Sequence, residues 1–217
     1  MTKIKICGLS QLKHAGAAVE AGADFLGFVF ATSPRQITPE RAREIVSALK
    51  DRPTCPAIVG VFVNTPAEDV NQIADYCRLD WVQLSGDEPS EYCRQIQRPI
   101  IKAVHVGSGQ STAEIAAQLQ AGFDMALGLD IIYLLDKKTE GVYGGTGQAF
   151  DWVLAKELAQ GFPFFLAGGL SPQNVAQAVK IVHPWGVDVS SGVETMGVKD
   201  AFKIKAFIEA VRGVEQK

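Results

Sequence analysis

The feature of this sequence that most constrains its fold is a regular alternation of strand-like and helix-like segments. Runs of β-branched, aromatic and other apolar residues, typical of buried strands, occur eight times. Segments with apolar residues at three- and four-residue spacing, typical of helices, follow them. The expected strands are 3–7, 24–30, 57–63, 80–84, 99–104, 130–135, 163–167 and 185–189, and the expected helices are 10–22, 39–50, 66–77, 88–96, 111–121, 150–160, 172–181 and 198–212.

This alternation predicts an α/β fold in which helices connect the strands of a parallel sheet. Eight units fit either an open doubly wound sheet or a closed (β/α)8 TIM barrel. Dividing 217 residues among eight units leaves about 27 residues for each, a compact spacing that favours the barrel. Because no linker or shift in composition interrupts the series, we expect residues 1–217 to form a single domain.

Three of the expected helices carry a clear start signal. Thr38, Thr65 and Ser171 each stand directly before a proline that opens a helical segment. A threonine or serine side chain can accept hydrogen bonds from the first N–H groups of a helix, and proline suits its first turn. We therefore expect these three residues to cap their helices.

Composition excludes several classes of protein. Apolar residues make up 47% of the chain and charged residues 21%, values typical of a globular protein. The net charge is −3 without long blocks of one sign, which argues against a nucleic-acid partner or an anionic membrane surface. Four cysteines without a C-x-x-C pair and three scattered histidines give no pattern for a metal site, and disulfides are not expected.

The apolar runs also bear on location. They are far shorter than the roughly 20 residues that cross a bilayer, and the first residues lack the apolar core of a secretory signal. We therefore expect a cytoplasmic protein without a membrane partner. The sequence does not determine the oligomeric state, although it slightly favours a monomer.

In a barrel, functional side chains lie at the carboxyl ends of the strands and in the loops that follow them. After the last two strands come Gly168 and Gly169, and then Ser190, Ser191 and Gly192. Glycine lets the backbone approach an anion closely, and barrels commonly bind phosphate at this place. These loops predict a phosphorylated small-molecule ligand, and the alternative is that the glycines only form tight turns.

Two reactive side chains end other strands. Cys7 ends the first strand, and Lys5 shares its face of that strand, where an ammonium group would favour the thiolate. Asp136 follows the sixth apolar run, where a buried carboxyl group must be paired, hydrogen-bonded or protonated. The alternatives are a buried structural cysteine and a carboxylate that caps a helix or pairs with a neighbouring lysine.

Other polar residues at the strand ends have weaker signals. Arg35 follows the second strand, where its guanidinium could bind a carboxylate at two points or simply lie on the surface. Asp188 lies in the last strand, and we expect it to face the barrel interior and contact the substrate. We interpret His105 and Asp87 as solvent-facing or structural.

The connection 136–149 is long for a loop between strand and helix and carries the glycine-rich stretch 144–147. A long glycine-rich connection at the barrel mouth is typical of a lid over a bound substrate. We therefore expect Gly145 and Gly147 to contact the substrate.

Eight motifs occur in order: KICGL at 5–9, GFVFATSPRQI at 27–37, VGVFVN at 59–64, VQLSGDE at 82–88, LLD at 134–136, GGTGQAFDW at 144–152, LAGGLSPQNV at 166–175 and GVDVSSGVE at 186–194. In these motifs the chain resembles, from end to end, the phosphoribosylanthranilate isomerases of tryptophan biosynthesis, which are single-domain (β/α)8 enzymes. One departure is Ser85, where the family usually has histidine, so no polar role is carried over to this position.

The resemblance implies an Amadori rearrangement of N-(5-phosphoribosyl)anthranilate to 1-(2-carboxyphenylamino)-1-deoxyribulose 5-phosphate, without metal or cofactor. It implies that Cys7 is the general base, Asp136 the general acid and Arg35 the group that binds the anthranilate carboxylate. It also implies that the two glycine-containing loops bind the phosphate. The chemistry requires a raised pKa for Asp136 and a lowered pKa for Cys7.

Two rival functions remain at this point. One is the histidine-pathway isomerase that performs the same rearrangement on another aminoaldose, or a barrel that does both, although that enzyme typically has aspartate where Cys7 stands here. The other is a barrel without catalytic activity that only binds a phosphorylated ligand.

Overall fold

In the computed structural model, which describes residues 1–107, 109–125, 128–137 and 151–215, eight strands form a closed parallel barrel. Each strand pairs with the next, and β1 closes the barrel on β8 through pairs such as Ile4 with Val187. The predicted (β/α)8 barrel is therefore confirmed. The strands are β1 (Lys3–Cys7), β2 (Phe25–Val29), β3 (Ala57–Phe62), β4 (Trp81–Leu84), β5 (Ile100–Val106), β6 (Ile131–Lys137), β7 (Phe164–Leu166) and β8 (Gly186–Val189).

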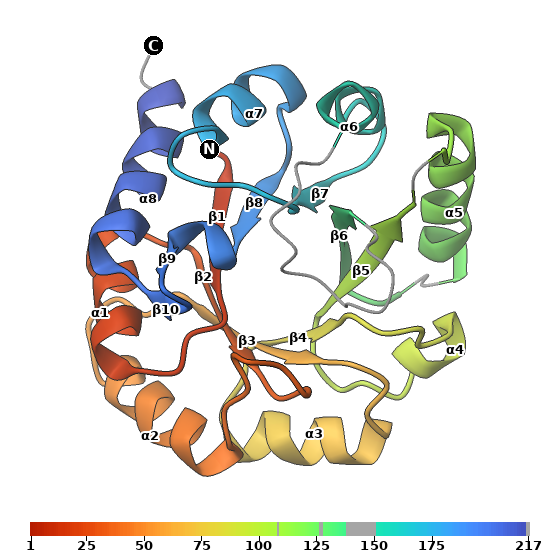
Figure 1. The fold of residues 1–217 in the computed structure, drawn as a ribbon. Helices are drawn as coiled ribbons and strands as arrows, with labels where there is room; N and C mark the ends of the chain where they lie inside the picture. Colours follow the sequence, from red (N-terminus) through yellow and green to blue (C-terminus); the bar gives the residue numbers. More distant parts are fainter. Residues whose placement is uncertain (108, 126–127, 138–150, 216–217) are drawn as a thin grey trace.

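The helices form a ring around the strands (Figure 1), and α8 completes it between α1 and α7. In the part of the chain that is described, no helix has both the length and the apolar character needed to cross a membrane. The helices are α1 (Leu12–Ala21), α2 (Pro39–Lys50), α3 (Ala67–Tyr76), α4 (Ser90–Cys93), α5 (Thr112–Met125), α6 (Trp152–Leu158), α7 (Val175–Val182) and α8 (Ala201–Glu215).

Successive side chains of each strand point alternately outward and inward. In β1, Ile4 and Ile6 join the apolar layer between the strands and the helices. Lys5 and Cys7 therefore point into the barrel. The predicted shared face of these two residues is confirmed, and it places an ammonium group and a thiol inside the ring of strands.

The main element that the sequence pattern did not predict is a small hairpin between β8 and α8. After the short helical turn η1 (Ser191–Val193), strand β9 (Glu194–Thr195) pairs antiparallel with β10 (Val198–Lys199). The connecting residues Met196 and Gly197 both have positive φ, 51° and 77°, as in the two-residue turns that match the twist of a hairpin. Helix α8 consequently begins at residue 201, not at the expected residue 198.

Of the three expected helix caps, only Thr38 is confirmed: its hydroxyl oxygen accepts a hydrogen bond from the Arg41 N–H at 3.3 Å. The prediction for Thr65 is wrong, because its side chain makes no cap bond and α3 begins after Pro66. The prediction for Ser171 is also wrong. The Asn174 side chain accepts from the Ser171 N–H and donates to the Gly169 carbonyl, which holds residues 171–174 in a turn before α7.

Candidate functional site

The interior of the barrel changes character from one end to the other. Near the amino ends of the strands, aromatic rings pack edge to face, with Phe25 5.3 Å from Phe165 and Phe165 4.9 Å from Trp185 between ring centroids. Toward the carboxyl ends the inward side chains include polar ones, among them those of Lys5 and Asp136. The aromatic layer fills the barrel at the amino ends of the strands. A ligand can therefore reach the polar groups of the barrel only from the carboxyl ends.

Cys7 and Lys5 lie together around Gly27 of β2. A methyl group at Gly27 would lie 2.9 Å from the Cys7 sulfur and 3.2 Å from the Lys5 nitrogen, so a side chain there would displace both groups. Lys5 is completely buried, and its Nζ donates to Asp188 Oδ1 at 2.7 Å. The expected inward direction of Asp188 is therefore confirmed, and its carboxylate compensates the buried ammonium.

Burial raises the pKa of the Cys7 thiol above its ordinary value, and the ammonium groups of Lys5 and Lys199 only partly offset this effect. The expectation that this pKa is lowered is therefore wrong. The physical reason is that desolvation of the thiolate, together with the negative charge of Asp188, outweighs the two neighbouring ammonium groups. At neutral pH the thiol form of Cys7 predominates.

Asp136 lies near the end of β6 with 8% of its surface exposed. Burial raises the pKa of this carboxyl group to about 6, while His105, its partner in the pairing of β5 with β6, acts in the opposite direction. Asp188 raises the pKa further, and the backbone N–H of Lys137 donates to Asp136 Oδ1 at 2.8 Å. The expected raised pKa of Asp136 is confirmed.

Cys7 and Asp136 project into the same end of the barrel, because β1 and β6 are parallel strands of one closed sheet. Both groups also interact electrostatically with the ion pair of Lys5 and Asp188. The site therefore contains a thiol and a protonatable carboxyl group, which come from strands well separated around the ring. A buried ion pair interacts electrostatically with both of them.

The raised pKa of Asp136 has a consequence for stability. Its folded value of about 6 exceeds the ordinary 3.8, so the folded state binds more protons between these values and loses stability as the pH rises through them. Above pH 6 the buried carboxylate costs about 3 kcal/mol. We expect Asp136→Asn to raise the free energy of unfolding by up to this amount at pH 8.

Urea denaturation of wild type and Asp136→Asn at pH 8 and pH 4 measures this effect. The two proteins should differ most at pH 8 and much less at pH 4, where the wild-type carboxyl group is protonated in the folded state and about half protonated in the unfolded state. A difference of the same size at both values would contradict the electrostatic explanation.

The loops that follow β7 and β8 lie against each other. Gly168 and Gly169 have φ values of 80° and 67°, a conformation that favours glycine. At Gly192 an added methyl group would overlap the Leu170 carbonyl, so the second loop packs closely on the first. Glycine is therefore favoured at residues 168 and 169 and sterically required at residue 192, and the two loops are in direct contact.

Arg35 also lies at this mouth, where its side chain packs over Gly8. Its Nε and one terminal nitrogen donate to both carboxylate oxygens of Glu194, at 2.6 and 3.0 Å. Glu194 also accepts from Lys199 at 2.5 Å. The sequence does not predict a role for Glu194 or Lys199, because the hairpin that carries them has no recognisable pattern.

The structure places His105, which the sequence leaves as solvent-facing or structural, half-buried near the carboxyl end of β5. Its Nε2 lies 3.0 Å from the Ser85 carbonyl oxygen, which can only accept, so this nitrogen carries a hydrogen. The hydroxyl group of Ser85 is buried and accepts from the Gln83 amide at 2.9 Å. Gly145 and Gly147 lie outside the described residues.

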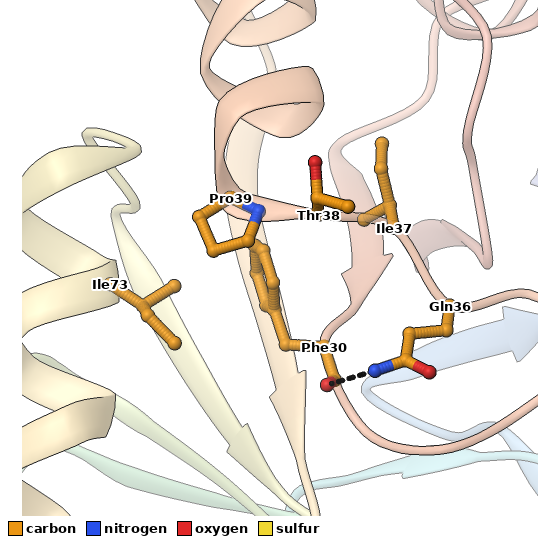
Figure 2. A pocket seen from close by; sticks show the side chains of 6 residues that line it. All are labelled: Phe30, Gln36, Ile37, Thr38, Pro39 and Ile73. Carbon is orange, nitrogen blue, oxygen red and sulfur yellow. Dashed lines mark hydrogen bonds between the residues drawn. The ribbon is translucent and has the colours of Figure 1, made fainter.

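A cavity of about 330 Å³ lies near Arg35 but outside the ring of strands. Figure 2 shows Phe30, Pro39 and Ile73 around it, with the Gln36 amide donating to the Phe30 carbonyl. The residues that line this cavity carry no charge. It therefore offers no charged group that would bind an anion, and the barrel mouth remains the candidate site.

Comparison with known proteins identifies the family to which the chain is similar. A family model described as N-(5'-phosphoribosyl)anthranilate isomerase matches residues 4–210. The chain is 49% identical to the enzyme of that name from Dehalococcoides mccartyi, covering 99% of this chain and 98% of that protein. It is 47% identical to that from Moorella thermoacetica, covering 100% and 92%.

Solved structures give the same result. A crystal structure of phosphoribosyl anthranilate isomerase from Thermotoga maritima matches with a TM-score of 0.84 at 40% identity and covers 98% of this chain and 100% of that one. Another structure of such an enzyme, in complex with reduced 1-(o-carboxyphenylamino)-1-deoxyribulose 5-phosphate, matches with a TM-score of 0.81 at 39% identity over the same shares.

Proposed function

This chain belongs to the N-(5'-phosphoribosyl)anthranilate isomerase family, and on that premise we propose that Cys7 is the general base and Asp136 the general acid of the isomerisation. The chain is an isomerase of tryptophan biosynthesis. The observation that carries the assignment of roles is the convergence of these two side chains on one polar barrel mouth, joined by the ion pair of Lys5 and Asp188.

The proposed reaction is an Amadori rearrangement, in which a proton moves from C2 of the sugar toward C1. Asp136 donates a proton to the ring oxygen, the bond between that oxygen and C1 breaks, and C1 forms a protonated imine with the anthranilate nitrogen. Cys7 as thiolate then removes the C2 proton, which leaves an enolamine. Proton transfer from the C2 hydroxyl to C1 gives 1-(2-carboxyphenylamino)-1-deoxyribulose 5-phosphate, with no net oxidation.

The environments of the two groups suit this division of roles. A carboxyl group with a pKa of about 6 donates a proton more readily near neutrality than a neutral amide or hydroxyl. The raised pKa of Cys7 makes its thiolate a strong base, although a minority species. The active form therefore arises when the proton of Cys7 moves to the Asp136 carboxylate, within the same set of coupled charges.

The substrate carries two anionic groups, and we propose a binding site for each. The phosphate binds at the loops with Gly168, Gly169 and residues 190–192, which pack together at the mouth. The anthranilate carboxylate binds Arg35, whose five N–H donors exceed the two that Glu194 uses. A related enzyme is known in complex with reduced 1-(o-carboxyphenylamino)-1-deoxyribulose 5-phosphate, a molecule that carries both anionic groups.

Arg35→Ala should weaken binding of the substrate by about 2–5 kcal/mol, because a desolvated carboxylate loses its charged partner. The reduced product analogue, which does not react, allows the dissociation constant to be measured by calorimetry for wild type and variant. Unchanged affinity would show that Arg35 does not bind the ligand.

A coupled assay tests the proposed function as a whole. Purified protein is mixed with freshly made N-(5-phosphoribosyl)anthranilate in one reaction and with the histidine-pathway aminoaldose in a parallel reaction. Product is measured in each. We expect product from the first substrate. Product from both substrates would indicate a bifunctional barrel, and no product from either would leave a protein that only binds a phosphorylated ligand.

A further inference from the structure

The hairpin β9–β10 brings a buried acid and a buried base together above the barrel mouth. Glu194 and Lys199 are directly paired across its two strands, and their side chains are only 8% and 3% exposed. Lys199 Nζ lies 2.5 Å from Glu194 Oε1. A buried ion pair stabilises a fold little more than apolar residues would, because desolvation of the two charges offsets their attraction. Stability alone therefore does not explain why this pair lies at the site.

Those contacts extend to both loops that the proposed function assigns to substrate anions. On one side, Glu194 accepts two hydrogen bonds from the Arg35 guanidinium. On the other, Lys199 Nζ donates to the carbonyl oxygen of Ser190 at 2.8 Å and lies 3.3 Å from its hydroxyl oxygen. One hydrogen-bonded unit therefore connects the β2 loop to the β8 loop.

The geometry of Arg35 decides what Glu194 can do. Glu194 occupies the edge of the guanidinium formed by Nε and Nη2, which fixes the plane of the group. The opposite edge carries Nη1 and the second N–H of Nη2, and this pair can bind another carboxylate at two points. Glu194 can therefore orient Arg35 without taking the donors that a ligand would use.

Hydrogen bonds attach the hairpin to the start of α8. Lys203 of α8 donates to the Glu194 carbonyl oxygen at 2.7 Å, and the Asp200 N–H donates to the Val193 carbonyl at 2.9 Å. The Thr195 hydroxyl donates to Asp200 at 2.8 Å. Asp200 and the first turn of α8 thus hold the backbone from which Glu194 reaches Arg35.

We propose that Glu194 and Lys199 are positioning residues: Glu194 orients Arg35 toward the substrate carboxylate, and Lys199 links that arm to the Ser190 loop that faces the phosphate. This inference rests on the proposed function. It predicts that Glu194 contributes to selection of a ligand with a carboxylate, whereas Lys199 contributes to binding at both ends.

Two stable ligands separate these roles: the reduced product analogue, and its counterpart made from aniline, which lacks the carboxylate. For Glu194→Gln we expect the dissociation constant of the first ligand to rise at least about tenfold and that of the second to stay unchanged. The KM for the substrate should rise, with kcat nearly constant. Lys199→Met should weaken both ligands.

Asp80→Asn is the matched control. Asp80 also accepts from a lysine, Lys50 at 2.7 Å, and from a backbone N–H, that of Ile58 at 2.8 Å, but it lies at the amino end of β4. The Asp80→Asn substitution should leave both dissociation constants unchanged. If Glu194→Gln does not fold, Glu194→Asp keeps the charge, withdraws it by one methylene and should show the same selective loss.

Equal weakening of both ligands by the Glu194 variants would reduce Glu194 to a structural role and overturn the inference. Tighter binding of the carboxylated ligand would overturn it too, because Glu194 would then compete with the substrate for Arg35. Failure of the proposed function gives a different result: the wild-type protein would form no product, or Arg35→Ala would not discriminate between the two ligands.

Discussion

Replacing Cys7 with alanine should lower kcat at least about a hundredfold while the barrel stays folded. The expected size is that of removing a positioned general base, because alanine cannot accept the C2 proton. Lys5 and Asp188 neutralise each other beside this position, so loss of the neutral thiol leaves no uncompensated charge. The measurement is kcat in the coupled assay, together with the thermal unfolding midpoint.

Two further variants separate chemistry from packing. Cys7→Ser keeps nearly the volume of the thiol but has a far higher pKa, so it should be as inactive as Cys7→Ala. Cys93→Ala removes another buried thiol, in α4, away from the barrel mouth, and should keep wild-type kcat. Near-normal turnover by Cys7→Ala would end the assignment of Cys7 as base.

Replacing Asp136 with asparagine should also lower kcat at least about a hundredfold, since an amide cannot protonate the ring oxygen. The amide oxygen can still accept the hydrogen bond from the Lys137 N–H, which preserves the local backbone. Loss of activity combined with a higher free energy of unfolding at pH 8 would show that the Asp136 carboxyl group serves catalysis and lowers the stability of the fold.

The dependence of kcat/KM on pH tests the same residue more sharply. Only the form with protonated Asp136 and ionised Cys7 is active. In wild type, kcat/KM should rise with pH up to about 6, stay level, and fall above the raised pKa of Cys7. Below pH 6 the rise reflects ionisation of Cys7, and the plateau begins where Asp136 loses its proton.

In Asp136→Asn the plateau should disappear, and the residual kcat/KM should continue to rise with pH toward the pKa of Cys7. A limb near pH 6 that persists in this variant would belong to the substrate phosphate, whose second pKa is also about 6. That result would contradict the assignment of the limb to Asp136.

The sequence was sufficient to predict the barrel because its evidence is periodic and repeated. Each strand is an apolar run, each helix has apolar residues at regular spacing, and errors at single boundaries do not change the count. The rule that barrel chemistry lies at the carboxyl ends of strands then led to Cys7, Asp136 and Asp188. These side chains enter the same polar mouth in the structure.

What could not be predicted depends on short-range geometry. The hairpin has strands of two residues each, too short for any alternation to be visible, so Glu194 and Lys199 were missed. The cap at Ser171 fails because the Asn174 side chain forms competing hydrogen bonds. The pKa of Cys7 depends on the balance between burial and charge, which only the packed structure determines.

The most direct test of the central claim is a crystal structure of this protein with the reduced product analogue bound. We predict the phosphate at the loops of residues 168–169 and 190–192, the Cys7 sulfur next to C2, and the Asp136 carboxyl group across the sugar, near the oxygen that was in the ring. A phosphate bound elsewhere, or both side chains on one side of the sugar, would contradict the mechanism.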